Sequence, residues 1–313
     1  MYIMRNAAYS FGVVSRMIGE VCGYKEIPLV SIPNDYVMLI GNPDAGMRSY
    51  LMNKVKWTKI VYSVLEGITR NSAVVDFFNG LKADHYTPSN YARKYHLLSG
   101  FSDLEVVPHA IKLGPVNTRY TNKGERVFGY LSGYLERKYP YFLRFLFDKL
   151  DHTVKWYVKT SGPNPFLQFF DKYDNKIYGD HDIESYYQSI DVYVNFGSGG
   201  GFEMTPLEAI GRGIPTIIPD MPLFRETIIS KWRNYPLVVD GMDDFYTWKF
   251  GDYIIPVWYY STDHMAKIIN EIANMPPSVY RDLKDEFVSK GPEFVKLYYP
   301  LSLYKRFCPN DNT

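Results

Sequence analysis

Cysteine is scarce in this sequence, and neither sign of charge is in excess. The two cysteines, Cys22 and Cys308, lie near opposite ends of the 313 residues and form no CxxC or metal-binding spacing. A disulfide framework or a zinc site is therefore not indicated, and a reducing cytoplasm is the expected compartment. Lys and Arg number 35 against 34 Asp and Glu, so no global field draws the chain to nucleic acid.

Long apolar runs are also missing. The segment MYIMRNAAYSFGVV has neither a long apolar stretch nor a small-residue cleavage site, and no run approaches the roughly 18 apolar residues of a spanning helix. We therefore expect a soluble protein, with peripheral contact to a membrane left open. No GxSxG nucleophile motif is present, and Asp243 and Asp244 in GMDDF are expected in a loop, without a metal.

The sequence does contain alternating strand and helix patterns punctuated by glycine and proline, which predict an α/β protein. Its length is that of roughly two domains of about 150 residues. The polar segment 113–125, LGPVNTRYTNKGE, is the predicted linker. We expect an N-terminal domain at 1–115, a second domain at 116–290 and a closing helix at 291–313.

The N-terminal half is predicted to begin with a strand at 2–5, a loop through Gly12 and a helix to about Val21. Further strands are expected at 37–40, 59–64 and 83–86, with helices at 73–81 and in SNYARKYHLLSG. In the second half, a strand at 154–159 and a helix at 183–189 precede the most informative segment.

That segment, DVYVNFGSGGGFEMTPLEAIGRGIPTIIPD, begins at Asp191. It predicts a strand at 191–196, a glycine loop at 197–201, a helix at 205–211 and a buried strand at 214–219. A glycine loop that leads into a helix directs backbone N–H groups and the positive end of the helix dipole at one point, which suits a phosphate. An ordinary βαβ crossover has the same pattern and is the alternative.

The segment GGGFEMTPLEA resembles the E-G-F-G-x-x-P-L-E-A signature of retaining glycosyltransferases of family 4. The residues that match are Phe202, Pro206, Leu207, Glu208 and Ala209. The resemblance implies the GT-B architecture, two Rossmann-like doubly wound domains facing each other across a cleft, with a short N-terminal domain here. It also implies that Glu208 binds the nucleotide ribose.

One departure concerns the contact with the donor sugar. Gly200 stands where the family has its first glutamate, and a carboxylate appears instead at Glu203, where the family has glycine. Glu203 is the candidate replacement. The diphosphate and sugar are expected to contact the remaining loop and helix-start residues, which are Gly200, Gly201, Phe202, Met204 and Thr205.

Four further candidate residues, in three segments, rest on weaker parts of the resemblance. SGYLERKYPYFLRFL resembles the family's G-R-x-x-x-x-K-G segment, which implies that Arg137 and Lys138 neutralise the donor diphosphate, although Tyr134 replaces the family's first basic residue. Gly12 resembles the N-terminal glycine loop. Glu66 in VYSVLEG lies where the family places a residue that faces the donor sugar. A solvated charge run, a turn and a loop charge are the respective alternatives.

The resemblance implies a metal-independent, retaining hexosyltransferase without a cofactor. It would move a sugar from a nucleoside diphosphate sugar to a hydroxyl of a glycan, lipid or protein acceptor. Two alternatives stay open. A catalytically silent GT-B protein would bind sugar nucleotides or act as a scaffold, and a nucleotide-sugar epimerase of the same architecture would need no acceptor.

Overall fold

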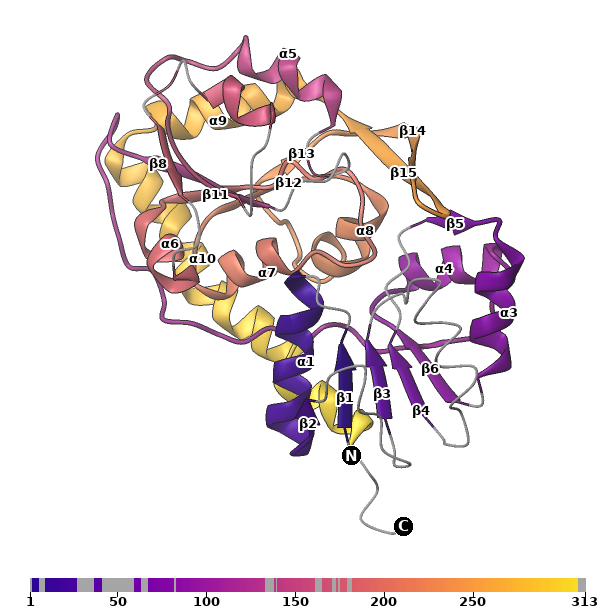
Figure 1. The fold of residues 1–313 in the computed structure, drawn as a ribbon. Helices are drawn as coiled ribbons and strands as arrows, with labels where there is room; N and C mark the ends of the chain where they lie inside the picture. Colours follow the sequence, from indigo (N-terminus) through magenta and orange to yellow (C-terminus); the bar gives the residue numbers. More distant parts are fainter. Residues whose placement is uncertain are drawn as a thin grey trace. The chain divides into compact units, whose positions relative to one another are not determined.

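The computed structural model describes residues 2–5, 9–26, 37–40, 59–62, 67–81, 83–132, 138, 140–160, 165–170, 173, 175–178 and 182–308. The chain divides into two compact units, each containing a six-stranded parallel sheet (Figure 1). Unit 1 comprises Met1–Lys112, Lys249–Ile255 and Tyr299–Thr313, and unit 2 comprises Leu113–Trp248 and Pro256–Tyr298. The sequence prediction of an α/β protein is therefore confirmed.

The sheet of unit 1 has the strand order β2-β1-β3-β4-β6-β7. Its strands are β1 (Tyr2–Arg5), β2 (Lys25–Glu26), β3 (Val37–Ile40), β4 (Lys59–Tyr62), β6 (Ala83–Thr87) and β7 (Glu105–Val106). The helices are α1 (Tyr9–Cys22), α3 (Ser72–Gly80) and α4 (Asn90–Leu98). Asn71 and Ser89 cap α3 and α4 because their side-chain oxygens accept backbone N–H bonds from the first turns. These caps explain why both helices begin close to where the sequence predicts.

Gly12 lies inside helix α1 (Tyr9–Cys22), so the loop predicted through this residue was wrong. Val14, Met17 and Ile18 are buried, and their spacing places them on one face of the helix. Burial of that face outweighs the cost of glycine in a helix, about 1 kcal/mol. The binding role suggested for Gly12 stays a prediction.

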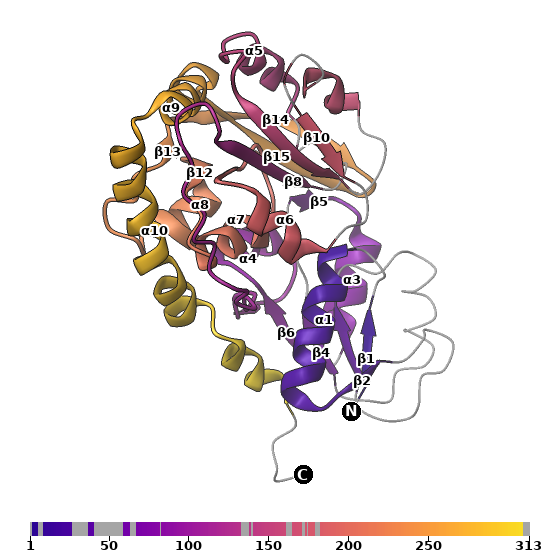
Figure 2. The same cartoon turned by 90° about the vertical axis from the view of Figure 1, so that its left-hand side faces the viewer.

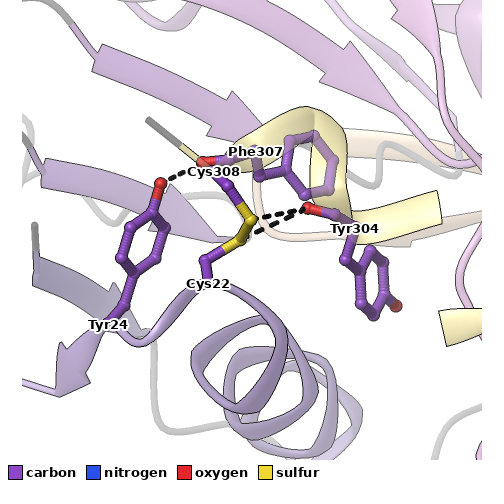
Figure 3. The surroundings of a disulfide bond; sticks show 5 residues. All are labelled: Cys22, Tyr24, Tyr304, Phe307 and Cys308. Atoms are coloured by element: carbon purple, nitrogen blue, oxygen red, sulfur yellow. Dashed lines mark hydrogen bonds between the residues drawn. A yellow bond between two sulfur atoms is a disulfide. The ribbon is translucent and has the colours of Figure 1, made fainter. Parts of the chain in front are cut away.

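The two cysteines form a disulfide, contrary to the sequence expectation (Figure 3). Cys22 ends helix α1, and Cys308 follows the 3₁₀ helix η5 (Leu301–Phe307), which packs against α1. The bond links residues 286 positions apart, and a chain-entropy argument gives a loop of this length about 5–6 kcal/mol of stabilisation. Sequence spacing could not reveal a pairing that depends on the two ends meeting. Cysteine scarcity therefore gives no argument for a reducing cytoplasm.

The sheet of unit 2 has the strand order β10-β9-β8-β11-β12-β13. Its strands are β8 (Val127–Ser132), β9 (Lys155–Thr160), β10 (Asn175–Tyr178), β11 (Val192–Val194), β12 (Thr216–Pro219) and β13 (Val238–Val239). The helices include α5 (Arg144–Phe147), α6 (Ile183–Ser189), α7 (Met204–Gly211), α8 (Pro222–Phe224), α9 (Thr262–Asn274) and α10 (Pro277–Tyr298), of which α9 and α10 follow one another along the unit (Figure 2). Every residue of β11 and β12 is buried, as expected for central parallel strands.

Helix α10 packs closely on helix α7 at a glycine. A Cβ atom on Gly291 would lie 2.1 Å from the carbonyl oxygen of Ile210, so this approach requires glycine. Because α7 carries the family-like motif, this packing helps to set where the motif residues lie.

A hairpin of β14 (Gly241–Phe250) and β15 (Tyr253–Tyr260) forms a small separate sheet with β5 (Ile68–Thr69). Asp243 and Asp244 lie in β14, so their prediction as loop residues was wrong. Most of β14 is exposed, which explains why its sequence lacks the alternation of a half-buried strand. Across the described residues, no helix combines the length and apolarity needed to span a membrane.

Two buried histidines of unit 1 predict instability in acid. Burial lowers the pKa of His96 to about 4 and that of His109 to about 3. His96 Nδ1 lies 2.8 Å from the carbonyl oxygen of Ala92, and His109 Nδ1 lies 2.9 Å from the hydroxyl of Tyr62. Both rings are therefore neutral in the folded protein at neutral pH.

Unfolded histidine titrates near pH 6.5, so the unfolded chain binds protons that the folded chain excludes. We expect full stability from these residues above about pH 6.5 and a loss of about 1.4 kcal/mol per histidine for each pH unit from there to about pH 4. Urea unfolding followed by circular dichroism at a series of pH values measures this slope. The double variant His96→Gln, His109→Gln should flatten it, and an unchanged slope would contradict the assignment.

Candidate functional site

A buried glycine loop connects strand β11 to helix α7 in unit 2. Each residue of the loop is buried, from Asn195 to Glu203. Gly200 has a φ of +138°, a conformation that side-chain-bearing residues rarely adopt. A glutamate at this position, as in the family signature, would therefore be strained. The departure at Gly200 is accompanied by a backbone that suits glycine.

Strand β15 holds the glycine loop in place through two hydrogen bonds. The backbone N–H of Trp258 donates to the carbonyl oxygen of Ser198 at 2.8 Å, and the Tyr260 hydroxyl donates to that of Phe196 at 3.0 Å. These bonds satisfy carbonyl groups that burial would otherwise leave without partners. The sequence analysis missed this role of β15, because the letters VWYY also fit an ordinary core strand.

Lys138 and Glu203, two predicted catalytic residues, form an ion pair. The Lys138 side chain is 17% exposed and that of Glu203 is 4% exposed, so solvent screens the pair weakly. The stem of Lys138 passes along the loop, since a Cβ on Gly197 would lie 3.6 Å from its Cδ atom. The Tyr130 hydroxyl donates to the Lys138 carbonyl oxygen at 2.7 Å and fixes the backbone there.

Glu203 occupies the N-cap position of α7, but its side chain accepts no capping hydrogen bond from the first turn. The carboxylate instead meets the Lys138 ammonium group. The ammonium group therefore lies close to the first residue of α7, where the helix dipole is positive. This arrangement gathers a lysine and backbone N–H groups at one end of the loop, which suits an anionic ligand.

Glu208 lies on the next turn of α7 and is half-buried. Its carboxylate accepts a hydrogen bond from the Tyr187 hydroxyl at 2.9 Å. Burial raises the pKa of Glu208, and the nearby Arg212 guanidinium partly opposes this effect. Thr205 is held in a similar way, because the Tyr193 hydroxyl donates to its Oγ1 atom at 2.9 Å. Tyrosines of α6 and β11 thus orient two predicted donor-binding residues.

Arg212 is a residue of this region that the sequence analysis missed. Its guanidinium pairs with the Glu184 carboxylate, lies 4.5 Å from the centre of the Tyr187 ring and donates to the Glu208 carbonyl oxygen at 2.9 Å. The four-residue spacing from Glu208 to Arg212 is a helical neighbour signal that the sequence offers. Its partner on α6 could not be found without the fold.

The remaining predicted site residues divide into two groups. Gly201, Phe202 and Met204 are buried in the loop and the start of α7. Arg137 and Glu66 lie outside the described residues, so their roles stay predictions. Within the described ranges, no three His, Cys, Asp or Glu side chains are grouped to hold a metal ion.

Solved structures similar to this chain are GT-B glycosyltransferases. TarM of S. aureus gives a TM-score of 0.66 at 12% identity, over 94% of this chain and 57% of TarM, so the chain spans a little over half of TarM's length. A glycosyltransferase from Rickettsia africae gives 0.62 at 14% identity, over 97% of this chain and 95% of the other. HepE of Anabaena gives 0.61 at 10% identity, over 97% of both chains. No protein-family model and no curated protein matches the sequence.

These similarities establish the fold class. Two units with parallel sheets and matches over nearly the whole chain define an α/β protein of the GT-B type. The identities are too low to transfer an activity, so function has to be argued from the site itself.

Loss of Arg212 should destabilise unit 2. We expect Arg212→Ala to lower the free energy of unfolding by about 2–3 kcal/mol, because it leaves Glu184 and the Glu208 carbonyl group without their cation. Arg212→Lys should recover only part of this loss, since an ammonium group cannot form the forked contact. Chemical denaturation measures the differences. The exposed Arg233→Ala is the control, and an equal effect of Arg233→Ala and Arg212→Ala would disprove the special role of Arg212.

Proposed function

We propose that this protein is a metal-independent, retaining hexosyltransferase that moves a sugar from a nucleoside diphosphate sugar to a hydroxyl acceptor. The observation that carries this proposal is the pairing of Lys138 with Glu203 at the junction of the glycine loop and α7. The GT-B fold of the solved neighbours supports the same class of reaction. The retained anomeric configuration is inferred from the resemblance of the PLEA segment to family 4.

The leaving group of such a transfer is a nucleoside diphosphate, which gains negative charge as the bond to the sugar breaks. Lys138 and the backbone N–H groups at the start of α7 would stabilise that charge. The protein's own cations would then replace the divalent metal that other transferases use. Arg137, next to Lys138 in the sequence, would add a guanidinium contact to the diphosphate.

Glu203 would contact the donor sugar as well as hold Lys138. Its carboxylate holds Lys138 beside the loop, and it stands three residues beyond Gly200, where the family has its sugar-binding glutamate. We propose that Glu203 contacts a hydroxyl of the donor sugar while it keeps Lys138 oriented. Glu208 would accept hydrogen bonds from the ribose hydroxyls, in the orientation that Tyr187 sets.

Uridine is the first base to test. The HepE structure contains UDP and glucose, and that of pneumococcal GtfA contains UDP and GlcNAc. The donors to screen first are therefore UDP-glucose and UDP-GlcNAc, with acceptors drawn from glycans, lipids and proteins. Release of UDP that persists in EDTA is the expected result, and no stabilisation or turnover with any nucleotide sugar would overturn the proposal.

A catalytically silent protein is the second candidate, and Gly200 is the observation that favours it. Its φ of +138° leaves no place for the family's first glutamate, so the donor sugar loses one carboxylate contact unless Glu203 supplies it. Binding of UDP-sugar without turnover in the presence of a broad acceptor panel would favour this candidate.

The proposed contact between Glu208 and the ribose can be tested by combining a ligand that lacks a ribose hydroxyl with a variant that lacks the carboxylate. We expect wild-type protein to bind UDP about tenfold more tightly than 2′-deoxy-UDP, the equivalent of about 1.4 kcal/mol. Glu208→Gln should weaken UDP binding and reduce this preference, because the carboxylate that accepts the hydroxyl is gone. Isothermal titration calorimetry gives all four affinities. A preference for UDP that survives in Glu208→Gln would contradict the ribose assignment.

Substitutions of Lys138 and Glu203 should have different effects. The first should change the turnover number kcat, and the second should change the binding of the donor. Lys138→Met should lower kcat by about 100-fold or more, since it removes charge stabilisation of the leaving group. Glu203→Gln should lower the affinity for the UDP-sugar relative to that for UDP, because the sugar contact is lost while Lys138, released from its ion pair, still meets the diphosphate. Lys149→Met, which removes a half-exposed lysine paired with Asp263, is the control. Wild-type kcat in Lys138→Met would exclude this residue from the reaction.

A further inference from the structure

A group of tyrosines on the hairpin and the neighbouring 3₁₀ turn has no part in the donor site described above. We name Tyr141, Tyr246 and Tyr259 the tyrosine surface. The Tyr141 and Tyr246 rings lie 5.2 Å apart, those of Tyr246 and Tyr259 lie 5.6 Å apart, and the hydroxyls of Tyr141 and Tyr259 are 2.9 Å apart. The three rings come from three separate segments, the turn at 141–143, β14 and β15. All three belong to unit 2.

The tyrosine surface packs against a buried ring and stays partly exposed to solvent. Phe142 is buried, and its ring lies 5.3 Å from that of Tyr259 and 6.1 Å from that of Tyr141. Tyr141 itself is 51% exposed. Fixed rings that stay partly in solvent contribute little to a core, whereas they provide a rigid contact area that loses little conformational entropy when a ligand binds.

An acidic side chain beside the tyrosine surface limits which kinds of ligand can bind there. Asp244 shares a face of β14 with Tyr246, because alternate residues of a strand point the same way. The hydroxyl of Tyr141 is the main cause that raises the pKa of Tyr259, and the nearby Asp244 carboxylate adds to it. An acidic side chain at this edge repels phosphate-rich ligands and accepts hydrogen bonds from hydroxyl groups.

The tyrosine surface is also joined to the glycine loop. Tyr259 stands between Trp258 and Tyr260 in β15, and these two residues donate the hydrogen bonds to the carbonyl oxygens of Ser198 and Phe196. Because successive side chains of a strand point to opposite faces, the Tyr259 side chain lies on the face of β15 opposite to that of Tyr260. A ligand on the tyrosine surface would therefore share strand β15 with the loop contacts and lie on its other face.

We propose that the tyrosine surface binds a neutral oligosaccharide. A pyranose ring has an apolar face that packs on aromatic rings, and hydroxyl groups at its edge that bond to tyrosine hydroxyls and to a carboxylate. Tyr141, Tyr246 and Tyr259 with Asp244 supply both kinds of contact. This binding does not depend on the proposed transferase function.

The test measures glycan binding and nucleotide binding separately on the full chain. A glycan array finds a ligand, and calorimetry with maltohexaose, cellohexaose and chitohexaose follows. We expect Tyr246→Ala combined with Tyr259→Ala to weaken oligosaccharide binding about tenfold or more and to leave UDP affinity unchanged. Tyr246→Phe with Tyr259→Phe keeps the rings and should retain part of the affinity. The control is Tyr120→Ala, which removes an exposed tyrosine whose hydroxyl pairs with Asp285.

The outcomes separate the two proposals. UDP binding without binding of any glycan, or glycan binding that the double alanine variant leaves intact, overturns the tyrosine surface and spares the proposed function. Glycan binding lost in the double alanine variant, together with no binding of any nucleotide sugar, supports the surface and overturns the transferase. Sedimentation with vesicles of phosphatidylglycerol and phosphatidylethanolamine that depends on Tyr246 and Tyr259, without glycan binding, assigns the surface to lipid and overturns the glycan proposal.

Discussion

The burial of the glycine loop between β11 and α7 is the constraint on which the candidate site depends. A loop without regular hydrogen bonds can be buried only if its backbone polar groups find other partners. Trp258 and Tyr260 of β15 supply two of these partners, and the Asn195 side chain supplies another by donating to the Gly197 carbonyl oxygen at 3.2 Å. The hairpin is therefore part of the architecture of the loop. A loop fixed in this way keeps one backbone conformation and needs little reorganisation when a ligand binds.

The same constraint explains the altered motif. A chain that takes a φ of +138° at Gly200 has no low-energy place for a glutamate there, so a carboxylate for the loop has to come from another position. Glu203 is the nearest residue of that kind, and it is buried in contact with Lys138. A buried carboxylate requires such a cation, because an unpaired charge in this place would be costly. The glycine at position 200 and the Lys138–Glu203 ion pair are therefore connected. The loop conformation requires glycine at position 200, and Glu203 supplies the carboxylate instead.

The sequence was sufficient where chemistry and periodicity act locally. The apolar run from Ile214 and the glycine loop before α7 predicted the central strands and the helix of unit 2, because each signal lies within about 30 residues. Helices α3 and α4 were predicted close to their observed bounds, and the structure shows that Asn71 and Ser89 cap them. The GT-B fold class, which the solved structures support, followed from the motif resemblance.

The disulfide and the Arg212 contact were missed for a different reason, since each depends on how separate elements pack. Cys22 meets Cys308 only because η5 packs on α1. Arg212 finds Glu184 on another helix, 28 residues earlier. Such pairs leave no periodic pattern, so composition and spacing could not have identified them.

An anionic ligand at the glycine loop would need more positive charge than Lys138 and the start of α7 provide. Lys138 is already neutralised by Glu203, so its full charge reaches a diphosphate only when the ligand draws the ammonium group away or competes for it. The start of α7 contributes the equivalent of about half a positive charge. A diphosphate carries more negative charge than these two sources offset, so the proposed reaction requires a further cation. Arg137, the neighbour of Lys138 in sequence, is the residue that the motif resemblance assigns to this task, and the existing ion pair explains why one lysine would not be enough.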